Sequence, residues 1–335
     1  MKDVAELAGV SFKTVSRVVN DEPGVSPAVT SRVKDAIATL SYRPDDRARG
    51  LRRRGTSPTT IGFIHADMSN PFFTAIHQGL EEVATTKDCL ILTGSSNESP
   101  ERHDALVNAF SSRRVDGLVV VPVDAPDRGG QSEALRAEID RGTPVVFVDR
   151  ESDLVGDLVM SDHYGGAVIG TDHLIAHGHR RIAFLGDQHY LYSAAERRRG
   201  FLNAMDRAGI VEFITMSDVT SEAQAEAVAR DLLLSENPPT ALFTAQNFVT
   251  IGAVRALHAT GCQESTALVG LDHIEMADVL RPGVTLLPQD AGALGQRAGE
   301  LLFERLMNAD APPTRAVLPL SLVPRGSGEI PGPFA

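Results

Sequence analysis

The chain has 335 residues, a formal net charge of −12, two cysteines and no tryptophan. Two cysteines exclude a disulfide framework and a four-cysteine metal site, and they suit a reducing cytosol. No apolar run approaches the roughly 18 residues that a membrane-spanning helix needs, and the polar amino terminus lacks the features of a secretory leader. We therefore expect a cytoplasmic protein with no membrane partner.

Residues 3–20 (DVAELAGVSFKTVSRVVN) predict two short helices joined by a tight turn. One face of the first helix is apolar, with side chains at i, i+3 and i+4: Val4, Leu7 and Ala8. Gly9 ends this helix, because glycine adopts the left-handed conformation at no steric cost. Ser11 supplies a side-chain oxygen to cap the second helix, which begins at Phe12. This helix-turn-helix pattern is typical of proteins that place the second helix in the major groove of DNA.

A third helix is predicted from Ser26-Pro27, since serine caps a helix and proline tolerates its first turn. Its apolar side chains follow helical spacing: Val29, Val33, Ala36, Ile37 and Leu40. We expect this helix to close a small core with Leu7, Val15 and Val19. The helix pattern alone fits an ordinary three-helix bundle equally well.

Charge favours the DNA-binding interpretation. Residues 1–60 contain eleven Lys/Arg and seven Asp/Glu, a net charge of +4, so residues 61–335 carry −16. The densest basic cluster follows the three predicted helices: Arg47, Arg49, Arg52, Arg53 and Arg54. A solvated charge run is the usual interpretation of such a stretch. Its position directly after a helix-turn-helix, on an otherwise acidic chain, instead favours contact with phosphates.

Residues 3–54 resemble the headpiece and hinge of the LacI/GalR transcriptional repressors, and the chain from there to about Val323 resembles their effector-binding core. Further strings carry the resemblance: IGFIHADMSNPFF (61–73), DGLVVVP (116–122), PVVFVDR (144–150), GHRRIAFLG (178–186) and LVGLDH (268–273). It implies a bacterial, nucleoid-associated regulator whose body has the periplasmic-binding-protein fold, with two lobes joined by three crossovers. We place the crossovers near Met160–Asp162, Pro288–Asp290 and Leu320–Leu322.

The resemblance also implies specific contacts with double-stranded operator DNA. Phe12 and Lys13 should face base edges, and Arg17 suits bidentate contact with guanine. The hydroxyls of Thr14 and Ser16 should donate to phosphates. Leu51 should wedge into the minor groove from a hinge helix, with Ala48 on the same face, although a linker residue packed on the core is the alternative for Leu51. The full expected set is Phe12, Lys13, Thr14, Ser16, Arg17, Asn20, Ala48, Leu51 and Arg52.

From Ile61 onward, apolar strand-like runs alternate with helical stretches, which indicates parallel sheets covered by helices. The expected strands are Thr60–Ile64, Cys89–Thr93, Gly117–Val121, Val145–Val148, Ile182–Leu185, Ala241–Thr244 and Ala267–Leu271. The expected helices between them include Phe73–Thr86, Pro100–Arg113 and Tyr164–His177. The predicted fold is therefore an all-α helix-turn-helix headpiece joined to a two-lobed α/β core with parallel sheets.

The predicted domains follow from this pattern. Residues 1–43 form the headpiece and residues 44–58 the hinge helix and linker. The amino-terminal lobe takes 59–160 plus 290–320, and the carboxyl-terminal lobe takes 161–289 plus 321–328. Residues 329–335 are expected to form a flexible tail, because they are rich in Gly and Pro.

Ligands of open α/β sheets bind beyond the carboxyl ends of the strands. This rule and the resemblance predict an effector site of ten residues: Asp67, Asn70, Phe72, Phe73, Asp149, Leu191, Ser193, Arg197, Gln246 and Asp272. Aromatic faces with Asp, Asn and Arg suit a polyhydroxylated ring, so we expect a sugar or sugar derivative. For each residue, a strand-end loop position or an inter-lobe latch is the alternative.

Two departures from the family bear on the ligand. The family commonly has Asn-Asp where this chain has Gln246-Asn247, so sugar specificity cannot simply be copied. Leu191 stands where purine-binding relatives carry Arg, which argues against a purine. Arg197 and Asp272 are the strongest carry-overs. Arg150 also follows a strand end, beside Asp149.

Other function classes find less support. The G-x-S-x-G, P-loop and H-E-x-x-H motifs are missing from the sequence, so we expect no enzyme and no cofactor. A sugar-processing enzyme would need paired carboxylates, for which Asp67 and Asp272 are the candidates. His173 and His177 have a spacing that can hold a metal, with His179 nearby, but the family has a similar turn without metal, so no metal is expected. A solute-binding protein would share the body but has no use for a helix-turn-helix.

The sequence therefore predicts a ligand-responsive transcriptional regulator, with a solute-binding protein as the alternative. Two-fold symmetry would match two headpieces to a near-palindromic operator, so we expect a homodimer. The carboxyl-terminal segment PRGSGEIPGPFA lacks the heptads that a tetramerising helical bundle requires.

Overall fold

The computed structural model describes residues 2–19, 23–40, 60–123 and 132–335. The chain divides into two compact units, residues 1–57 and 58–335. The described part of the first unit contains α1 (Lys2–Ala8), α2 (Phe12–Val19) and α3 (Pro27–Thr39).

The turn between α1 and α2 has the predicted chemistry. Gly9 adopts a φ of +62°, and the Ser11 Oγ accepts a hydrogen bond from the Thr14 N–H at 3.2 Å. Ser26 occupies the N-cap position of α3 and Pro27 is the first helical residue, but the Ser26 side chain makes no capping hydrogen bond. The turn geometry therefore follows from Gly9 and Ser11, as the sequence indicated.

The small core of the headpiece differs from the expected set at two positions, Leu7 and Leu40. Its buried side chains are Val4, Ala5, Ala8, Val15, Val18, Val19, Val33 and Ala36. Leu7 is 54% exposed, and Leu40 is also exposed. At 100° per residue, Val4, Ala5 and Ala8 share one face of α1, and Leu7 lies about 100° from its centre. The prediction that Leu7 belongs to the core is therefore wrong.

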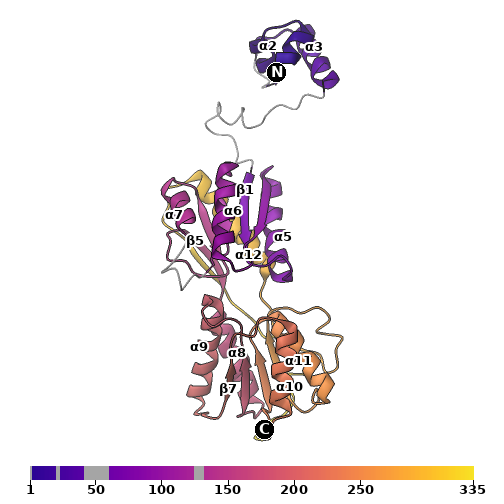
Figure 1. The fold of residues 1–335 in the computed structure, drawn as a ribbon, viewed down its shortest axis with the longest axis vertical. Helices are drawn as coiled ribbons and strands as arrows, with labels where there is room; N and C mark the ends of the chain where they lie inside the picture. The colour runs from indigo at the N-terminus through magenta and orange to yellow at the C-terminus, as the bar shows by residue number, and fades with distance from the viewer. Residues whose placement is uncertain (1, 20–22, 41–59, 124–131) are drawn as a thin grey trace. The chain divides into compact units, whose positions relative to one another are not determined.

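The second unit alternates strands and helices (Figure 1). Its first lobe contains β1 (Thr60–His65), α5 (Pro71–Thr86), β2 (Leu90–Ser95), α6 (Pro100–Ser112), β3 (Leu118–Val120), α7 (Glu133–Asp140), β4 (Val145–Val148), β5 (Asp157–Ser161), α12 (Ala291–Met307) and β11 (Arg315–Leu318). Its second lobe contains α8 (His163–Ala176), β6 (Ile182–Leu185), α9 (Tyr192–Arg207), β7 (Ile214–Met216), α10 (Glu222–Leu233), β8 (Ala241–Thr244), α11 (Asn247–Thr260), β9 (Ala267–Leu271) and β10 (Thr285–Leu287).

Each lobe is built on a parallel sheet. The strand order is β11-β5-β4-β3-β1-β2 in the first lobe and β10-β9-β8-β6-β7 in the second. Every named strand pair is parallel. Helices α5 and α12 contribute to the core on one face of the first sheet, and α6 and α7 to the core on the other. Helices α10 and α11 cover one face of the second sheet, and α8 and α9 the other.

Four strands were not anticipated: β5, β7, β10 and β11. Three of these, β7, β10 and β11, lie at sheet edges. The strands β7 and β11 are only partly buried, so their sequences lack the continuous apolar run that marked the central strands. The strand β2 also ends two residues later than expected, at Ser95.

The chain crosses between lobes after β5, after β10 and after β11, close to the three expected segments. Met160 packs in the core of the first lobe and Leu320 in that of the second. Among the described helices, none has both the length and the apolar character that crossing a membrane requires.

Residues 329–335 do not form the flexible tail that the sequence predicted. The N–H groups of Gly332 and Phe334 donate to the carbonyls of His177 and Gly178, at 2.7 and 3.2 Å. His179 donates from Nε2 to the Ile330 carbonyl at 2.9 Å. Backbone pairing against the loop after α8 therefore holds this Gly- and Pro-rich segment in place, which composition alone could not reveal.

Candidate ligand cavity and DNA-binding surface

A cavity of about 380 Å³ lies where the carboxyl ends of strands from both lobes meet. All ten residues predicted for effector binding line it: Asp67, Asn70, Phe72, Phe73, Asp149, Leu191, Ser193, Arg197, Gln246 and Asp272. They follow β1, β4, β6, β8 and β9, so the strand-end rule located them correctly. Their contact with a ligand stays a prediction.

Eight further residues line the cavity: Asn97, Glu98, Arg150, Asp187, Gln188, Thr220, Phe248 and Gln289. Asp187 follows β6 by two residues, so the same rule could have found it. Thr220 and Gln289 follow β7 and β10, which the sequence analysis missed. Glu98 follows the end of β2, which was placed too early.

The positive charge of Arg150 is balanced by carboxylates of the first lobe. Its side chain is 6% exposed, and it donates to both carboxylate oxygens of Glu98 at 2.9 and 2.7 Å. Its Nε lies 3.3 Å from the Asp149 carboxylate. Burial raises the pKa of Asp149, and the nearby guanidinium groups of Arg150 and Arg197 oppose that shift.

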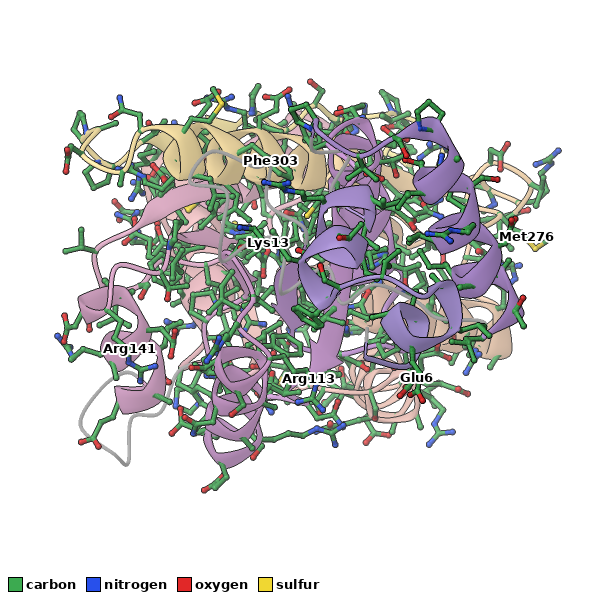
Figure 2. All side chains as sticks on the ribbon, turned by 90° about the horizontal axis from the view of Figure 1, so that it is seen from above. Glu6, Lys13, Arg113, Arg141, Met276 and Phe303 are labelled. Atoms are coloured by element: carbon green, nitrogen blue, oxygen red, sulfur yellow. The ribbon has the colours of Figure 1, made fainter. Side chains whose placement is uncertain are left out.

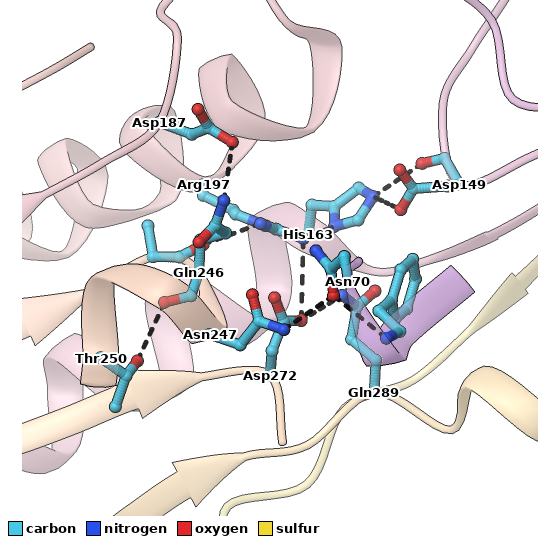
Figure 3. Close-up of polar contacts among 12 residues, drawn as sticks. Asn70, Asp149, His163, Asp187, Arg197, Gln246, Asn247, Thr250, Asp272 and Gln289 are labelled. Carbon is cyan, nitrogen blue, oxygen red and sulfur yellow. Dashed lines mark hydrogen bonds and ion pairs between the residues drawn. The ribbon is translucent and has the colours of Figure 1, made fainter. Parts of the chain in front are cut away.

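Arg197 is joined to this cluster through His163, which extends from the second lobe to Asp149 in the first (Figure 3). It is buried on α9 and donates to the Ala245 carbonyl at 2.7 Å and to His163 Nδ1 at 3.3 Å. Its terminal nitrogen also lies 4.0 Å from the Asp272 carboxylate. The pKa of His163 is lowered to about 3, mainly because the side chain is buried and secondly because Arg197 is positively charged. His163 is therefore neutral and donates from Nε2 to the Asp149 carbonyl at 2.8 Å.

Two cavity aspartates have a left-handed backbone. Asp149 and Asp272 follow β4 and β9 with φ angles of 73° and 76°. This conformation is unfavourable for most side chains other than Gly, Asn and Asp. Asp272 also accepts a hydrogen bond from Gln289 Nε2. Both residues line the cavity directly after their strands.

Besides the bond from His163 to the Asp149 carbonyl, a second hydrogen bond joins the two lobes across the cavity. Asn247 Nδ2 donates to Asn70 Oδ1 at 2.8 Å (Figure 3). Asn70 Oδ1 also accepts from the Phe72 N–H as the cap of α5, and Asn247 Oδ1 accepts from the Phe248 N–H. These backbone donors determine which end of each amide faces the other lobe. Asparagine at 247, where the family commonly has an acid, thus supplies a donor that a carboxylate lacks.

The three histidines considered for a metal site have other partners. His173 Nε2 lies 2.6 Å from Glu329, His177 Nδ1 donates to the His173 carbonyl, and His179 binds the Ile330 carbonyl. No cluster of His, Cys, Asp and Glu suited to a metal occurs among the residues described. These histidines hold the carboxyl-terminal segment.

On the headpiece, most of the described DNA-binding candidates are accessible. Phe12 is 51% exposed, and Lys13 is also exposed (labelled in Figure 2). Thr14 and Arg17 are partly exposed. Ser16 is buried, so the structure does not present its hydroxyl to a phosphate as expected. Asn20, Ala48, Leu51 and Arg52 lie outside the described residues.

Two family models match the chain. Residues 1–45 match the bacterial regulatory proteins of the lacI family, and residues 171–328 match a periplasmic binding protein-like domain. The chain is 30% identical to the HTH-type transcriptional repressor PurR of Aliivibrio fischeri over 92% of each chain. It is 30% identical to the ribose operon repressor of Escherichia coli over 98% of this chain and 99% of the relative.

Solved structures extend this similarity. The lac repressor dimer bound to operator and the anti-inducer ONPF is 27% identical, with a TM-score of 0.81 over 97% of this chain and 98% of that one. The transcriptional regulator CelR in complex with cellobiose is also 27% identical, with a TM-score of 0.70 and the same coverage. Both halves of the expected architecture therefore occur together in known transcriptional regulators.

Proposed function

Since the chain belongs to the LacI family of bacterial regulatory proteins, we propose that it is a homodimeric repressor whose cleft binds a sugar or sugar derivative. It is a ligand-responsive, DNA-binding transcriptional regulator. The repressor relatives match nearly the whole chain, headpiece included, which favours this function over that of a solute-binding protein without a regulatory role.

The cavity carries the proposal for the ligand. Phe72 and Phe73 offer aromatic surface beside amide, carboxylate and guanidinium groups from both lobes. Sugar rings pack their C–H faces on aromatic side chains, and their hydroxyls pair with such polar groups. A ligand that contacts both lobes changes the free energy of one inter-lobe arrangement relative to another, and so couples to the headpiece.

For DNA, the proposal rests on the exposed residues at the start of α2. Two-fold symmetry of a dimer requires two related half-sites, so the operator should be near-palindromic. The lac repressor structure similar to this chain is a dimer bound to operator. Because an operator is part of the chromosome, the proposal includes association with the bacterial nucleoid.

The test selects duplexes from a random DNA pool with purified full-length protein and then titrates sugars against the recovered site. We expect one near-palindromic sequence, and a change in its affinity with at least one sugar. Recovery of mixed, salt-sensitive sequences would contradict operator recognition. A specific operator whose affinity no sugar changes would contradict only the ligand class.

Arg17→Ala tests the headpiece assignment. We expect a loss of about 1–3 kcal/mol of binding free energy for the selected operator and a relaxed preference at one base position in each half-site. Competition binding with single-base variants of the operator measures this. Arg32→Ala, an exposed arginine on α3, is the control and should leave the base preference unchanged. Equal base preferences in the wild type and Arg17→Ala would refute base reading by Arg17.

A further inference from the structure

The cavity between the lobes is lined by more acids than bases. Its carboxylates are Asp67, Glu98, Asp149, Asp187 and Asp272, and its guanidinium groups are Arg150 and Arg197. His163, behind the cavity, is neutral because of its lowered pKa. The described lining therefore contains three more carboxyl groups than guanidinium groups, in a site where burial strengthens electrostatic effects.

Both arginines already have anionic or carbonyl partners. Arg150 makes two hydrogen bonds to Glu98 and lies beside Asp149. Both terminal nitrogens of Arg197 are engaged by the Ala245 carbonyl and by His163 and Asp272. Its Nε is the one nitrogen of that side chain without a protein acceptor in the described residues. Neither arginine offers the two-nitrogen edge that binds a phosphate or carboxylate.

Asp187 is a lining carboxylate without a cationic partner among the described residues. One oxygen accepts a hydrogen bond from the Gln188 N–H at 2.7 Å. The other accepts from Gln246 Nε2 at 3.1 Å (Figure 3). Both donors are neutral. Burial raises the pKa of Asp187, and these two hydrogen bonds, together with the positive charges of Arg150 and Arg197, oppose the shift. Each carboxylate oxygen retains a lone pair for a further donor.

Gln246 determines where this carboxylate lies. Its Oε1 accepts from the Phe248 and Val249 N–H groups, at 2.9 and 3.3 Å, as the cap of α11. The NH2 group of the same amide therefore faces Asp187, since the reversed amide would lose both capping bonds. Gln246, one of the two residues that depart from the family's Asn-Asp pair, is thus a positioning residue for Asp187.

We propose that the cavity selects a ligand without a phosphate or carboxylate group, and that Asp187, positioned by Gln246, is the specificity-determining residue. Asp187 accepts a hydrogen bond from a ligand hydroxyl or amine, and its charge repels anionic sugars. The inference rests on the proposed function, because it specifies the class of sugar that the same cleft binds.

Isothermal titration of the full-length protein with matched sugars tests this. The neutral and amino probes are D-ribose, D-glucose, D-glucosamine and cellobiose, and their anionic counterparts are ribose 5-phosphate, glucose 6-phosphate, glucosamine 6-phosphate and cellobionate. We expect at least one neutral or amino sugar to bind at least roughly tenfold more tightly than its anionic counterpart. Asp187→Asn should lower the affinity for the neutral sugar by roughly tenfold. It should also reduce the ratio between the affinities for the neutral sugar and for its anionic counterpart.

Two variants make the result specific to Asp187. Asp231→Asn removes an exposed charge from α10 of the same lobe and should change neither affinity. Asp187→Glu keeps the charge while moving it, so anionic sugars should remain excluded. If Asp187→Asn fails to fold, the wild-type comparison of each sugar with its anion still decides the ligand class.

The possible results distinguish the sugar effector itself from the exclusion of anionic sugars by Asp187. An anionic sugar that binds more tightly than its neutral counterpart overturns this inference and leaves a sugar effector in place. An unchanged preference in Asp187→Asn overturns the role of Asp187. Failure of every probe to bind the wild type counts against the sugar effector itself, and this inference falls with it.

Discussion

Arg305→Ala is expected to lower the free energy of unfolding by about 3–5 kcal/mol, because it leaves a buried carboxylate without its partner. Arg305 on α12 donates to both oxygens of Asp157 on β5, at 3.0 and 2.9 Å. Asp157 is 2% exposed and also accepts from the Thr314 N–H at 2.7 Å. Arg305 further donates to the carbonyls of Ala309, Ala311 and Pro312.

The pair thus ties the last turn of α12 to the sheet and to the segment that leads into β11. Urea unfolding followed by circular dichroism measures the effect as a lower midpoint. Arg297→Ala on the same helix is the matched control, because Arg297 pairs only with the exposed Glu300 and Glu304 among the described acids. It should cost less than about 1 kcal/mol. Equal midpoints for the two variants would show that the Arg305 pair does not stabilise the lobe.

Asp272→Asn is expected to abolish the effect of a sugar on operator affinity and to leave ligand-free operator binding within about twofold. Asn accepts the left-handed backbone of this position and can still accept from Gln289. The change therefore removes a charge from the cavity, beside Arg197, without reshaping the turn. Loss of the charged acceptor weakens its hydrogen bonds to ligand hydroxyls.

Operator affinity measured by fluorescence anisotropy, with and without the sugar found by titration, provides the readout. Coupling of this kind is typically about 1–3 kcal/mol, a 5- to 150-fold change in affinity. Asp278→Asn is the control, because it removes an exposed charge from the loop that follows β9. A sugar response with an unchanged midpoint in Asp272→Asn would place the effector outside this cavity.

In the second unit, the apolar runs located buried central strands but missed several edge strands. Strands β4, β6, β8 and β9 lie where their apolar runs predicted, because central strands of a parallel sheet are buried on both faces. The edge strands β7 and β11 have no such run, and they were missed. Thr220, after β7, was therefore also missed as a cavity residue, although the rule that located Asp272 applies to it equally.

In the headpiece, the helical spacing of α1 did not identify its buried face. Helical spacing predicted Val4, Leu7 and Ala8 as the buried face, and the exposed Leu7 shows that spacing alone does not determine which face is buried. Packing with Val15 and Val33 buries Ala5, beside Val4 and Ala8, in place of Leu7. Gly9 and Ser11, in contrast, act within one turn of the chain, and both behave as predicted.

Local periodicity, helix caps and strand ends were sufficient for the helix-turn-helix and for most elements of the second unit. The resemblance to a known family indicated the family and, together with the strand-end rule, the ten cavity residues. The partners of those residues were decided only by folding. The Asn247–Asn70 bond and the Arg305–Asp157 pair each join positions more than a hundred residues apart, and the direction of each amide depends on backbone N–H groups that only the folded chain places. Electrostatic and hydrogen-bond partners depend on distances in space, and no pattern along the chain contains those distances.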